Sequence, residues 1–279
     1  MQKRKKLMLL SISRFCVKML SKVSKLSPAK VNLTFQVLGK RLDGYHAIET
    51  LMQAVSLFDR LHFSLSSDTI TCSDPDIPCD ERNLVWKARE LFRKASGIFE
   101  PIAIDIEKKI PVQAGLGGGS SNAATTLFAL NEIFQKPLSE KQLIHLGSEL
   151  GSDVPFFFSS GSALCTGRGE IFTDQSHLNK ELTIVKPKHL HLSTPQVYKH
   201  AIIGEGLEHA AFIVLPELQQ VKANLLEIFD EVTMSGSGTA FVCFGDPKSA
   251  IPENFSSFVC RPIQKNSGGW YTLEHVQSV

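Results

Sequence analysis

One stretch of the chain, from Ile110 to Asn131, carries no charged residue. Its first part reads PVQAGLGGGSSN (residues 111–122) and is too rich in glycine to form regular secondary structure. In its second part and just beyond it, apolar residues fall on one stripe of a helix: Ala123, Ala124, Leu127, Leu130 and Phe134. The sequence therefore predicts a glycine-rich loop that opens directly into a helix.

This loop is a candidate phosphate site. Glycines let backbone amides approach a ligand closely, and a helix N-terminus carries about half a positive charge. It is not a Walker A loop, because no Lys-Ser/Thr pair follows the glycines. It also departs from the dinucleotide fingerprint, because the segment after the helix lacks a strand that ends in an acid at the expected distance. The alternative is a helix capped by a tight turn, which needs fewer than three consecutive glycines and two serines.

A phosphate in this loop needs a cation from elsewhere in the chain. Lys30 is one candidate, since it lies in the uncharged segment SPAKVN (residues 27–32) that leads into a predicted strand. Lys108 and Lys109 directly precede the loop and are the other candidates. For each of these two, a solvated surface position is an equally good interpretation.

Other residues fit either a functional or a structural role. Asp153, in GSDVP before three phenylalanines, could be a helix cap or a catalytic base. The second glycine loop, SGSG at 235–238, fits a turn or a phosphate contact. Tyr45 and His46 follow an Asp-Gly turn and could stack on a base or be ordinary partly buried side chains.

Composition limits the classes of protein that remain. The 279 residues are 43% hydrophobic and 21% charged, which is typical of a globular protein of one or two domains. No run of 18 apolar residues predicts a membrane span. Residues 1–26 hold eight Lys and Arg and no acid, so the rest of the chain has 22 basic against 28 acidic residues, a net charge of −6. We therefore expect neither a nucleic-acid partner nor a membrane partner.

The six cysteines are scattered, with no CxxC pair and no histidine clustered near them. We interpret them as reduced thiols of a cytoplasmic protein and expect no zinc or other protein-held metal site. The basic segment 1–26 has apolar residues at helical spacing, the last of them Val23 and Leu26. It could be a transit peptide, an over-extended start or a poorly ordered tail, and we favour the tail.

The remaining pattern alternates strands and helices. Before residue 160, strands are predicted at 31–37, 45–57 and 102–106, and helices from the cap Asn83 to Gly97 and from the capping box at Ser139 to Gly151. After residue 180, strands are predicted at 182–185, 240–244 and 270–273, and helices at Thr194 and at 218–228. Strands interleaved with helices in this way predict an α+β fold with a small two-layer second domain.

Three loops in this order resemble the GHMP kinase superfamily: PAKVN (28–32), PVQAGLGGGSSNA (111–123) and MSGSG (234–238). Within it, four more segments are similar to the branch that acts on 4-diphosphocytidyl-2-C-methyl-D-erythritol in the non-mevalonate isoprenoid route: RLDGYH (41–46), NLV (83–85), GSDVP (151–155) and GRGE (167–170). The resemblance covers residues 27–279.

The resemblance implies a GHMP kinase two-domain fold. Residues 1–26 would be an extension, 27–165 the N-terminal ATP-binding domain, and 166–279 a smaller ferredoxin-like C-terminal domain. The active site would lie in the cleft between the domains. The enzyme would be a phosphotransferase that acts on a small-molecule substrate in the cytoplasm, as a monomer or weak homodimer.

The resemblance also implies a role for each matched residue. Asp153 would be the catalytic base for the substrate's 2-hydroxyl, and Lys30 would offset developing charge. ATP would be bound by Asn83 and by the loop residues Pro111, Val112, Gln113, Ala114, Gly115, Leu116, Gly117, Gly118, Gly119, Ser120 and Ser121. The substrate would be bound by Asn32, Tyr45, His46, Lys108 and Thr194. Magnesium would accompany ATP, coordinated by the phosphates and by Ser120 or Ser121.

Two rival interpretations stay open at this point. The first is another small-molecule kinase of the superfamily, such as a homoserine or mevalonate kinase, in which a cytidine-recognising Tyr45-His46 pair would have no role. The second is a non-catalytic α/β protein that binds RNA through its basic tail. The net charge of −6 on the body and the glycine loop weigh against it.

Overall fold

A computed structural model describes residues 22–265 and 269–272 of the chain. The first unit contains the strands β1 (Lys22–Asn32), β2 (Gln36–Lys40), β3 (His46–Ser64), β4 (Ile70–Cys72), β5 (Ala103–Glu107), β6 (Ser162–Thr166) and β7 (Ile171–Asp174). Its helices are α2 (Leu84–Ser96), α3 (Gly118–Ile133) and α4 (Glu140–Leu150), followed by the 3-10 turn η1 (Pro155–Phe158).

The second unit contains β8 (Leu182–Pro187), α5 (Thr194–Tyr198), α6 (Leu207–Val214), α7 (Glu217–Ile228), β9 (Glu231–Met234), β10 (Phe241–Phe244) and β11 (Phe255–Cys260). Its four strands lie in the order β11-β8-β10-β9, and every pair is antiparallel. This is the strand order of a ferredoxin-like β-α-β-β-α-β unit. The crossover between β10 and β11 contains no helix in the described chain.

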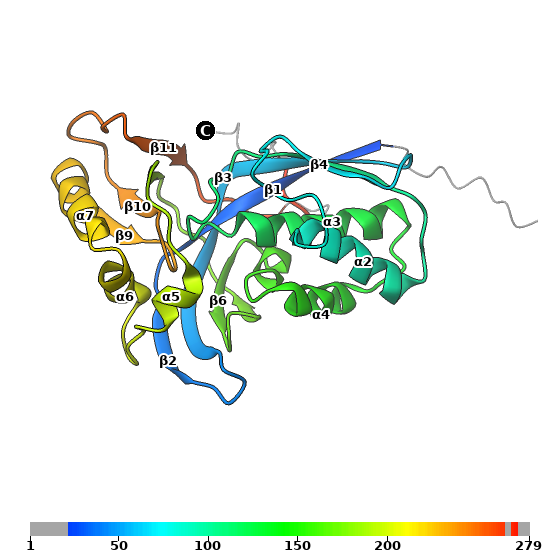
Figure 1. The fold of residues 1–279 in the computed structure, drawn as a ribbon, viewed down its shortest axis with the longest axis horizontal. Coiled ribbons are helices and arrows are strands. Elements are labelled where there is room, and N and C mark those ends of the chain that lie inside the picture. Colours follow the sequence, from blue (N-terminus) through cyan, green and yellow to red (C-terminus); the bar gives the residue numbers. More distant parts are fainter. Residues whose placement is uncertain (1–21, 266–268, 273–279) are drawn as a thin grey trace, which may run out of the picture.

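Strand β3 organises the first unit. Over its 19 residues it pairs with β1, β2, β5 and β6, and only β4 and β5 pair in parallel. Helices α2, α3 and α4 gather on one face of this sheet (Figure 1). Strand β3 begins at His46 and carries the fully buried Asp59 in its second half. Strand β3 therefore connects His46 and Asp59, two residues that matter for the site described below.

Local signals place the helices as the sequence predicts. The Asn83 side chain accepts a hydrogen bond from the amide of Val85 at the start of α2, and Gly97 ends the helix with φ 73°. Ser139 and Gln142 form the capping box of α4. Helix α3 follows the glycine loop directly, and most of its residues are buried. The α+β fold and these helices are thus confirmed, but α3 already begins at Gly118, inside the segment 111–122 that was predicted to be irregular.

Two predictions, one about a strand and one about the N-terminal segment, are wrong in part. The predicted strand 31–37 is interrupted, because β1 ends at Asn32 and β2 begins at Gln36. Strand β1 already begins at Lys22, so Val23 and Leu26 belong to it and not to a helix or tail, and they pair with Phe63 and Arg60 of β3. The rest of that predicted segment, residues 1–21, lies outside the described residues.

The C-terminal end also differs from the prediction. Residues 270–272 do not form a strand, and Leu273 lies outside the described residues. Trp270 and Tyr271 instead join the core of the first unit, where the Trp270 ring stacks on Phe128 of α3 with centroids 4.5 Å apart. Large aromatic side chains contribute stability by burying area, whatever the local backbone conformation.

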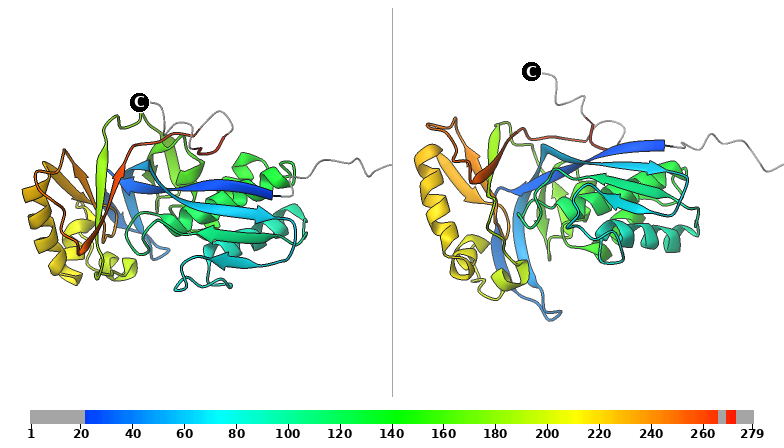
Figure 2. Two further views of the ribbon diagram at one scale, coloured as in Figure 1. Left: turned by 90° about the horizontal axis from the view of Figure 1, so that it is seen from above. Right: turned by 45° about the horizontal axis from the view of Figure 1, so that its top comes forward.

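The predicted domain boundary at 165/166 falls between β6 and β7, which pair in the same sheet. We therefore propose a division after Asp174, with residues 182–260 as the second unit. The chain then returns to the first unit through a bridge between Val55 and Pro262 (Figure 2). No helix in the described part of the chain is long and apolar enough to cross a bilayer.

Lys265 fastens this returning segment to the first unit. Its ammonium donates to the carbonyl of Phe158 at 2.5 Å and lies over the rings of Phe158 and Trp270. Burial lowers the pKa of Lys265 to about 8, and the negative charges of Glu140 and Asp174 act in the opposite direction. The buried turn η1, which follows Asp153, is therefore held by the Lys265 ammonium in an apolar setting.

This pKa predicts a pH-dependent stability. Below pH 8 Lys265 is charged in both the folded and unfolded states, whereas between about pH 8 and 10.5 only the unfolded chain keeps the proton. The free energy of unfolding of the wild type, relative to that of Lys265→Met, should therefore rise by about 1 kcal/mol between pH 7 and pH 9. Urea denaturation of both proteins at the two pH values measures it. A difference that stays constant or falls would contradict the prediction.

Candidate active site

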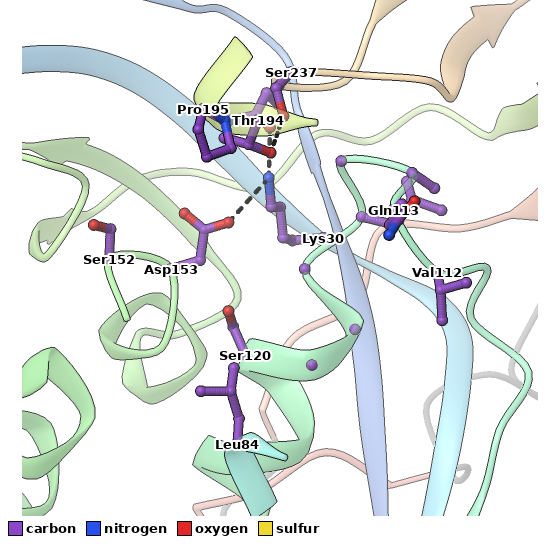
Figure 3. Close-up of a pocket in the computed structure, with 18 of the residues that line it drawn as sticks. Lys30, Leu84, Val112, Gln113, Ser120, Ser152, Asp153, Thr194, Pro195 and Ser237 are labelled. Carbon is purple, nitrogen blue, oxygen red and sulfur yellow. Dashed lines mark hydrogen bonds and ion pairs between the residues drawn. The ribbon is translucent and has the colours of Figure 1, made fainter. Parts of the chain in front are cut away.

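A cavity of about 1180 Å³ lies between the two units and is lined by residues of both. Every sequence-predicted site residue except Ser121 lines it. Figure 3 shows how its central side chains are arranged: Lys30 and Asp153 point toward one another, with Thr194 and Ser237 beyond the Lys30 ammonium.

The glycine loop is held in place through its backbone. The amide of Lys30 donates to the carbonyl of Leu116 at 2.9 Å, and the amide of Ala240 donates to the carbonyl of Ala114 at 3.1 Å. Gly115 and Gly117 have φ of 75° and 67°, which side chains disfavour. A Cβ at Gly115 would also lie 2.0 Å from the carbonyl oxygen of Ser235. The loop therefore touches the second glycine loop backbone to backbone.

The loop ends at the N-terminus of α3. Gly117 caps the helix, and the first intrahelical bond runs from the amide of Ser121 to the carbonyl of Gly117 at 2.8 Å. The amides of the first turn, residues 118–120, have no partner within a helix of this geometry. Gly118, Gly119 and Ser120 all line the cavity, so these amides offer an anion site with a favourable helix dipole.

Lys30 and Asp153 form the charged centre of the cavity. The Lys30 ammonium lies 3.4 Å from a carboxylate oxygen of Asp153, and the two side chains are 4% and 31% exposed. Asp153 caps neither α4 nor η1, whose caps are Gly151 and Val154. The structure thus brings Asp153 to a buried cation. The sequence left open whether Asp153 is a helix cap or a catalytic base, and this geometry favours the catalytic base.

Asn32 fixes the position of the Lys30 ammonium. Lys30 Nζ donates to Asn32 Oδ1 at 2.7 Å, and Asn32 Nδ2 donates to Thr50 Oγ1 at 2.7 Å. The amide of Asn32 donates to the hydroxyl of Ser235 at 3.2 Å, and this hydroxyl donates to the carbonyl of Gly115 at 3.0 Å. Strand β1, the glycine loop and the second unit are therefore joined at one serine.

Aromatic side chains form another part of the wall. The rings of His46 and Tyr198 stack with centroids 5.2 Å apart, and the guanidinium of Arg168 lies 4.9 Å from the centre of the Tyr45 ring. Burial raises the pKa of Tyr198, and the negative charge of Asp153 raises it further. Tyr198 is therefore a neutral ring that lies within the field of the central carboxylate.

Three predicted residues have contacts that define their surroundings. Thr194 Oγ1 lies 2.7 Å from Ser237 Oγ of the second glycine loop. Both polar groups of the Asn83 side chain are engaged, with Val85 and with the carbonyl of Pro78. Lys108 pairs with Asp59 at 2.6 Å and stands 3.0 Å from where a Cβ of Gly118 would lie. Lys108 therefore belongs beside the glycine loop, and these contacts give no support to its predicted place among the substrate residues.

Ser121 does not line the cavity, contrary to the sequence prediction. It is fully buried, and its hydroxyl accepts a hydrogen bond from Ser27 Oγ at 2.8 Å. Successive helix residues point in directions about 100° apart, so Ser120 can face the cavity while Ser121 faces β1. Of the two serines considered for magnesium, only Ser120 is accessible to a ligand.

The lining is strongly cationic. It includes six Lys and Arg side chains and, among the described residues, a single acid, Asp153. These six cations are Lys30, Lys40, Arg82, Lys108, Arg168 and Lys199. Low-dielectric walls concentrate such a field. Although the body of the chain is acidic overall, this cavity suits ligands that carry several negative charges.

The side chains of the described residues also indicate how magnesium would be held. The structure contains no cluster of three or more His, Cys, Asp or Glu side chains among the residues that it describes. Magnesium commonly keeps several waters and is held by one or two protein oxygens together with substrate phosphates. The Ser120 hydroxyl fits this mode, in which the nucleotide brings the metal.

Ser235, Tyr198 and Arg168 are site residues that sequence reasoning did not single out. Each lies in a segment that had been noticed for another reason: SGSG at 235–238, the helix that begins at Thr194, and GRGE at 167–170. The spacing within those segments indicated turns or a helix, but not which side chain faces the cavity.

Comparison with known proteins shows the family to which the chain belongs. The model of the GHMP kinases N terminal domain matches residues 83–161. The 4-diphosphocytidyl-2-C-methyl-D-erythritol kinase of Protochlamydia amoebophila (strain UWE25) is 45% identical over 267 residues, which cover 88% of this chain and 92% of that protein. The chain belongs to the 4-diphosphocytidyl-2-C-methyl-D-erythritol kinase family. It is therefore a phosphotransferase, as the sequence predicts.

Other members of this family are similar over most of their length. The chloroplastic enzyme of Arabidopsis thaliana is 38% identical over 264 residues, which cover 82% of this chain and 69% of that protein. A crystal structure of 4-(cytidine 5'-diphospho)-2C-methyl-D-erythritol kinase superimposes with a TM-score of 0.70 at 31% identity, covering 85% and 99% of the two chains. A homoserine kinase from Cytophaga hutchinsonii ATCC 33406 has a TM-score of 0.68 at 18% identity, covering 88% and 96%, and shows the shared fold alone.

The contact between the two glycine loops predicts a strong effect of one methyl group. Gly115→Ala should lower the free energy of unfolding by about 2 to 4 kcal/mol, because the new Cβ meets a backbone carbonyl at a positive φ. Gly119→Ala is the matched control, since its Cβ meets only a Leu84 methyl at 3.7 Å and its φ is not positive. Urea denaturation of the two variants tests this. Equal stabilities would contradict the close contact.

Proposed function

We propose that this protein transfers the γ-phosphoryl group of ATP to the 2-hydroxyl of 4-diphosphocytidyl-2-C-methyl-D-erythritol in the non-mevalonate isoprenoid route. The observation that carries the proposal is the buried Lys30 ammonium 3.4 Å from Asp153, beside a glycine loop that opens into α3. The names of the relatives, which this chain matches over most of their length, support ATP as the phosphoryl donor and the isoprenoid pathway. The residue roles come from the resemblance to the family, and the geometry of the Lys30–Asp153 pair supports those of these two residues.

The proposed reaction uses one base and one cation. Asp153 accepts the proton of the attacking hydroxyl while its oxygen bonds to the γ-phosphorus, and the bond from that phosphorus to the bridging oxygen breaks to release ADP. Lys30 stabilises the charge on the transferred group. Phosphoryl transfer needs mainly positioning and charge stabilisation from the protein, so a single oriented carboxylate is sufficient. Magnesium bound to the nucleotide would neutralise phosphate charge near Ser120.

The two substrates would occupy different parts of the cavity. The ATP phosphates would lie on the first-turn amides of α3, with Pro111–Gly117 along them and Asn83 near the nucleotide. The cytosine would lie against Tyr45, His46 and Tyr198, which offer flat faces and a polar ring edge. Two polyphosphate ligands agree with a lining of six cations and one acid. The cytoplasmic location and the monomer or weak homodimer stay predictions.

ADP release by the purified chain with ATP and magnesium tests the reaction and the acceptor together. The cytidyl-diphosphate methylerythritol, mevalonate and homoserine are offered in parallel assays. Turnover with the first alone is expected, because only this acceptor uses the aromatic wall. Turnover with another acceptor would keep the kinase and discard the substrate, and no turnover with any of them would reject the proposal.

Asp153→Asn should lower kcat by about two to four orders of magnitude while ATP affinity is retained, which is the usual range for loss of a general base. Steady-state kinetics and a nucleotide-binding titration measure the two quantities. Asp105→Asn is the control: that carboxylate is exposed on β5, bonds to Thr71 and should leave kcat within about twofold. If ATP affinity falls together with kcat, Asp153 has a structural role.

His46→Ala should raise the KM of the cytidyl substrate more than the KM of ATP. The imidazole stacks on Tyr198, away from the glycine loop contacts, so its removal opens only the aromatic part of the cavity. Initial rates with each substrate varied in turn measure the two constants. An equal rise in both KM values would contradict a role of His46 in binding the cytosine.

A further inference from the structure

Asp59 is a charged residue in the core of the first unit that the proposed chemistry does not use. It lies in β3, and its side chain has no exposed surface. A carboxylate taken out of water costs several kcal/mol unless charges and hydrogen bonds compensate for it. The groups that compensate here all come from the two ends of the glycine loop.

One carboxylate oxygen holds the start of the loop. Asp59 Oδ1 accepts hydrogen bonds from the backbone amide of Lys109 at 2.7 Å and from that of Ile110 at 2.8 Å. These two residues directly precede Pro111, the first residue of the loop. The backbone that enters the loop is therefore fixed to β3 by a charged acceptor, a stronger class of hydrogen bond than one between neutral groups.

The other oxygen holds the end of the loop. Asp59 Oδ2 accepts from Asn122 Nδ2 at 2.9 Å, in the early part of α3, and from Lys108 Nζ at 2.6 Å. The same ammonium donates to the carbonyl of Ile110 at 2.8 Å and lies against Gly118, where a Cβ would be 3.0 Å away. Lys108 therefore connects the two ends, and one carboxylate closes the loop.

We propose that Asp59 is a positioning residue for the nucleotide loop: it sets the spacing between the entry at residues 109–110 and the first turn of α3, and so pre-forms the phosphate site. The inference rests on the proposed binding of ATP at this loop. Asp59 itself touches no substrate, because it is fully buried behind the loop. Small displacements of positioning groups have large kinetic costs, so this closure matters even without contact.

Asp59→Asn tests the inference because it keeps the side-chain shape. The amide oxygen can still accept from the residue 109–110 backbone, but the new NH₂ group then faces Lys108 and Asn122, which are both donors. The KM of ATP should rise about 10- to 100-fold, the range for losing hydrogen bonds to a charged group. The KM of the cytidyl substrate should stay within about twofold, since its proposed contacts lie elsewhere in the cavity.

A second measurement does not depend on catalysis. Without nucleotide, backbone amides of residues 109–120 should exchange with deuterium at least about tenfold faster in Asp59→Asn than in the wild type, while those of α7 should not change. Asp68→Asn is the matched control: it removes a carboxylate that pairs with Arg89 and Arg93 in the same unit. It should leave both the KM of ATP and exchange in the loop unchanged.

The outcomes separate the alternatives. An unchanged KM of ATP in folded Asp59→Asn, or an equal rise in both KM values, would overturn the inference and leave Asp59 with a structural role only. If Asp59→Asn does not fold, Asn122→Ala removes one of the four donors without unpairing a charge, and it should give the same selective effect with a smaller factor. A wild-type chain that binds no ATP would instead reject the proposed function on which the inference rests.

Discussion

The close approach of two glycine loops is the constraint on which the site depends. The carbonyl of Ser235, in the second unit, lies where a side chain at Gly115 would be, and the hydroxyl of Ser235 bonds to β1 and to the carbonyl of Gly115. At this point the two loops can therefore meet only backbone to backbone. The cavity between them, with Lys30 and Asn32 at its centre, takes its shape from this contact, and a single methyl group would push the loops apart.

Electrostatics then decide what the cavity can hold. The lining holds six cations and, among the described residues, one acid, Asp153, so the cavity favours ligands that carry several negative charges. Its neighbour Lys30 is almost fully buried and is directed by Asn32 and Thr50. A fixed ammonium in a poorly hydrated setting stabilises developing charge more than a mobile one does, because it needs no reorganisation. Asn32 fixes the position of Lys30 by a hydrogen bond, and the buried Asp59 fixes the entry of the glycine loop in the same way.

Much of the fold followed from local signals. The caps at Asn83 and Ser139, the stop at Gly97 and the glycine loop before α3 are short-range interactions, so they can be recognised in a sequence of any fold. The errors came where long-range packing overrides local pattern. Val23 and Leu26 have helical spacing but pair with β3, and Trp270 stacks on a helix more than 100 residues earlier in the chain. The boundary predicted at 165/166 rested on local pattern as well, which does not contain the pairing of β7 with β6 on which our proposed division rests.

By itself, the sequence identified the candidate groups: a glycine loop at a helix N-terminus, a lysine in an uncharged setting, and one acid after a glycine stop. Its resemblance to the GHMP kinases indicated phosphoryl transfer. Those features depend on residue type and on neighbours along the chain. Only the tertiary structure decided which of them meet. It joined Lys30 to Asp153, turned Ser121 away from the cavity, set Lys108 beside the loop, and showed Asp59 at the closure of that loop. The reason is that each of these contacts joins residues 49 to 123 positions apart in the sequence or depends on which way a side chain faces, and neither is determined by local pattern.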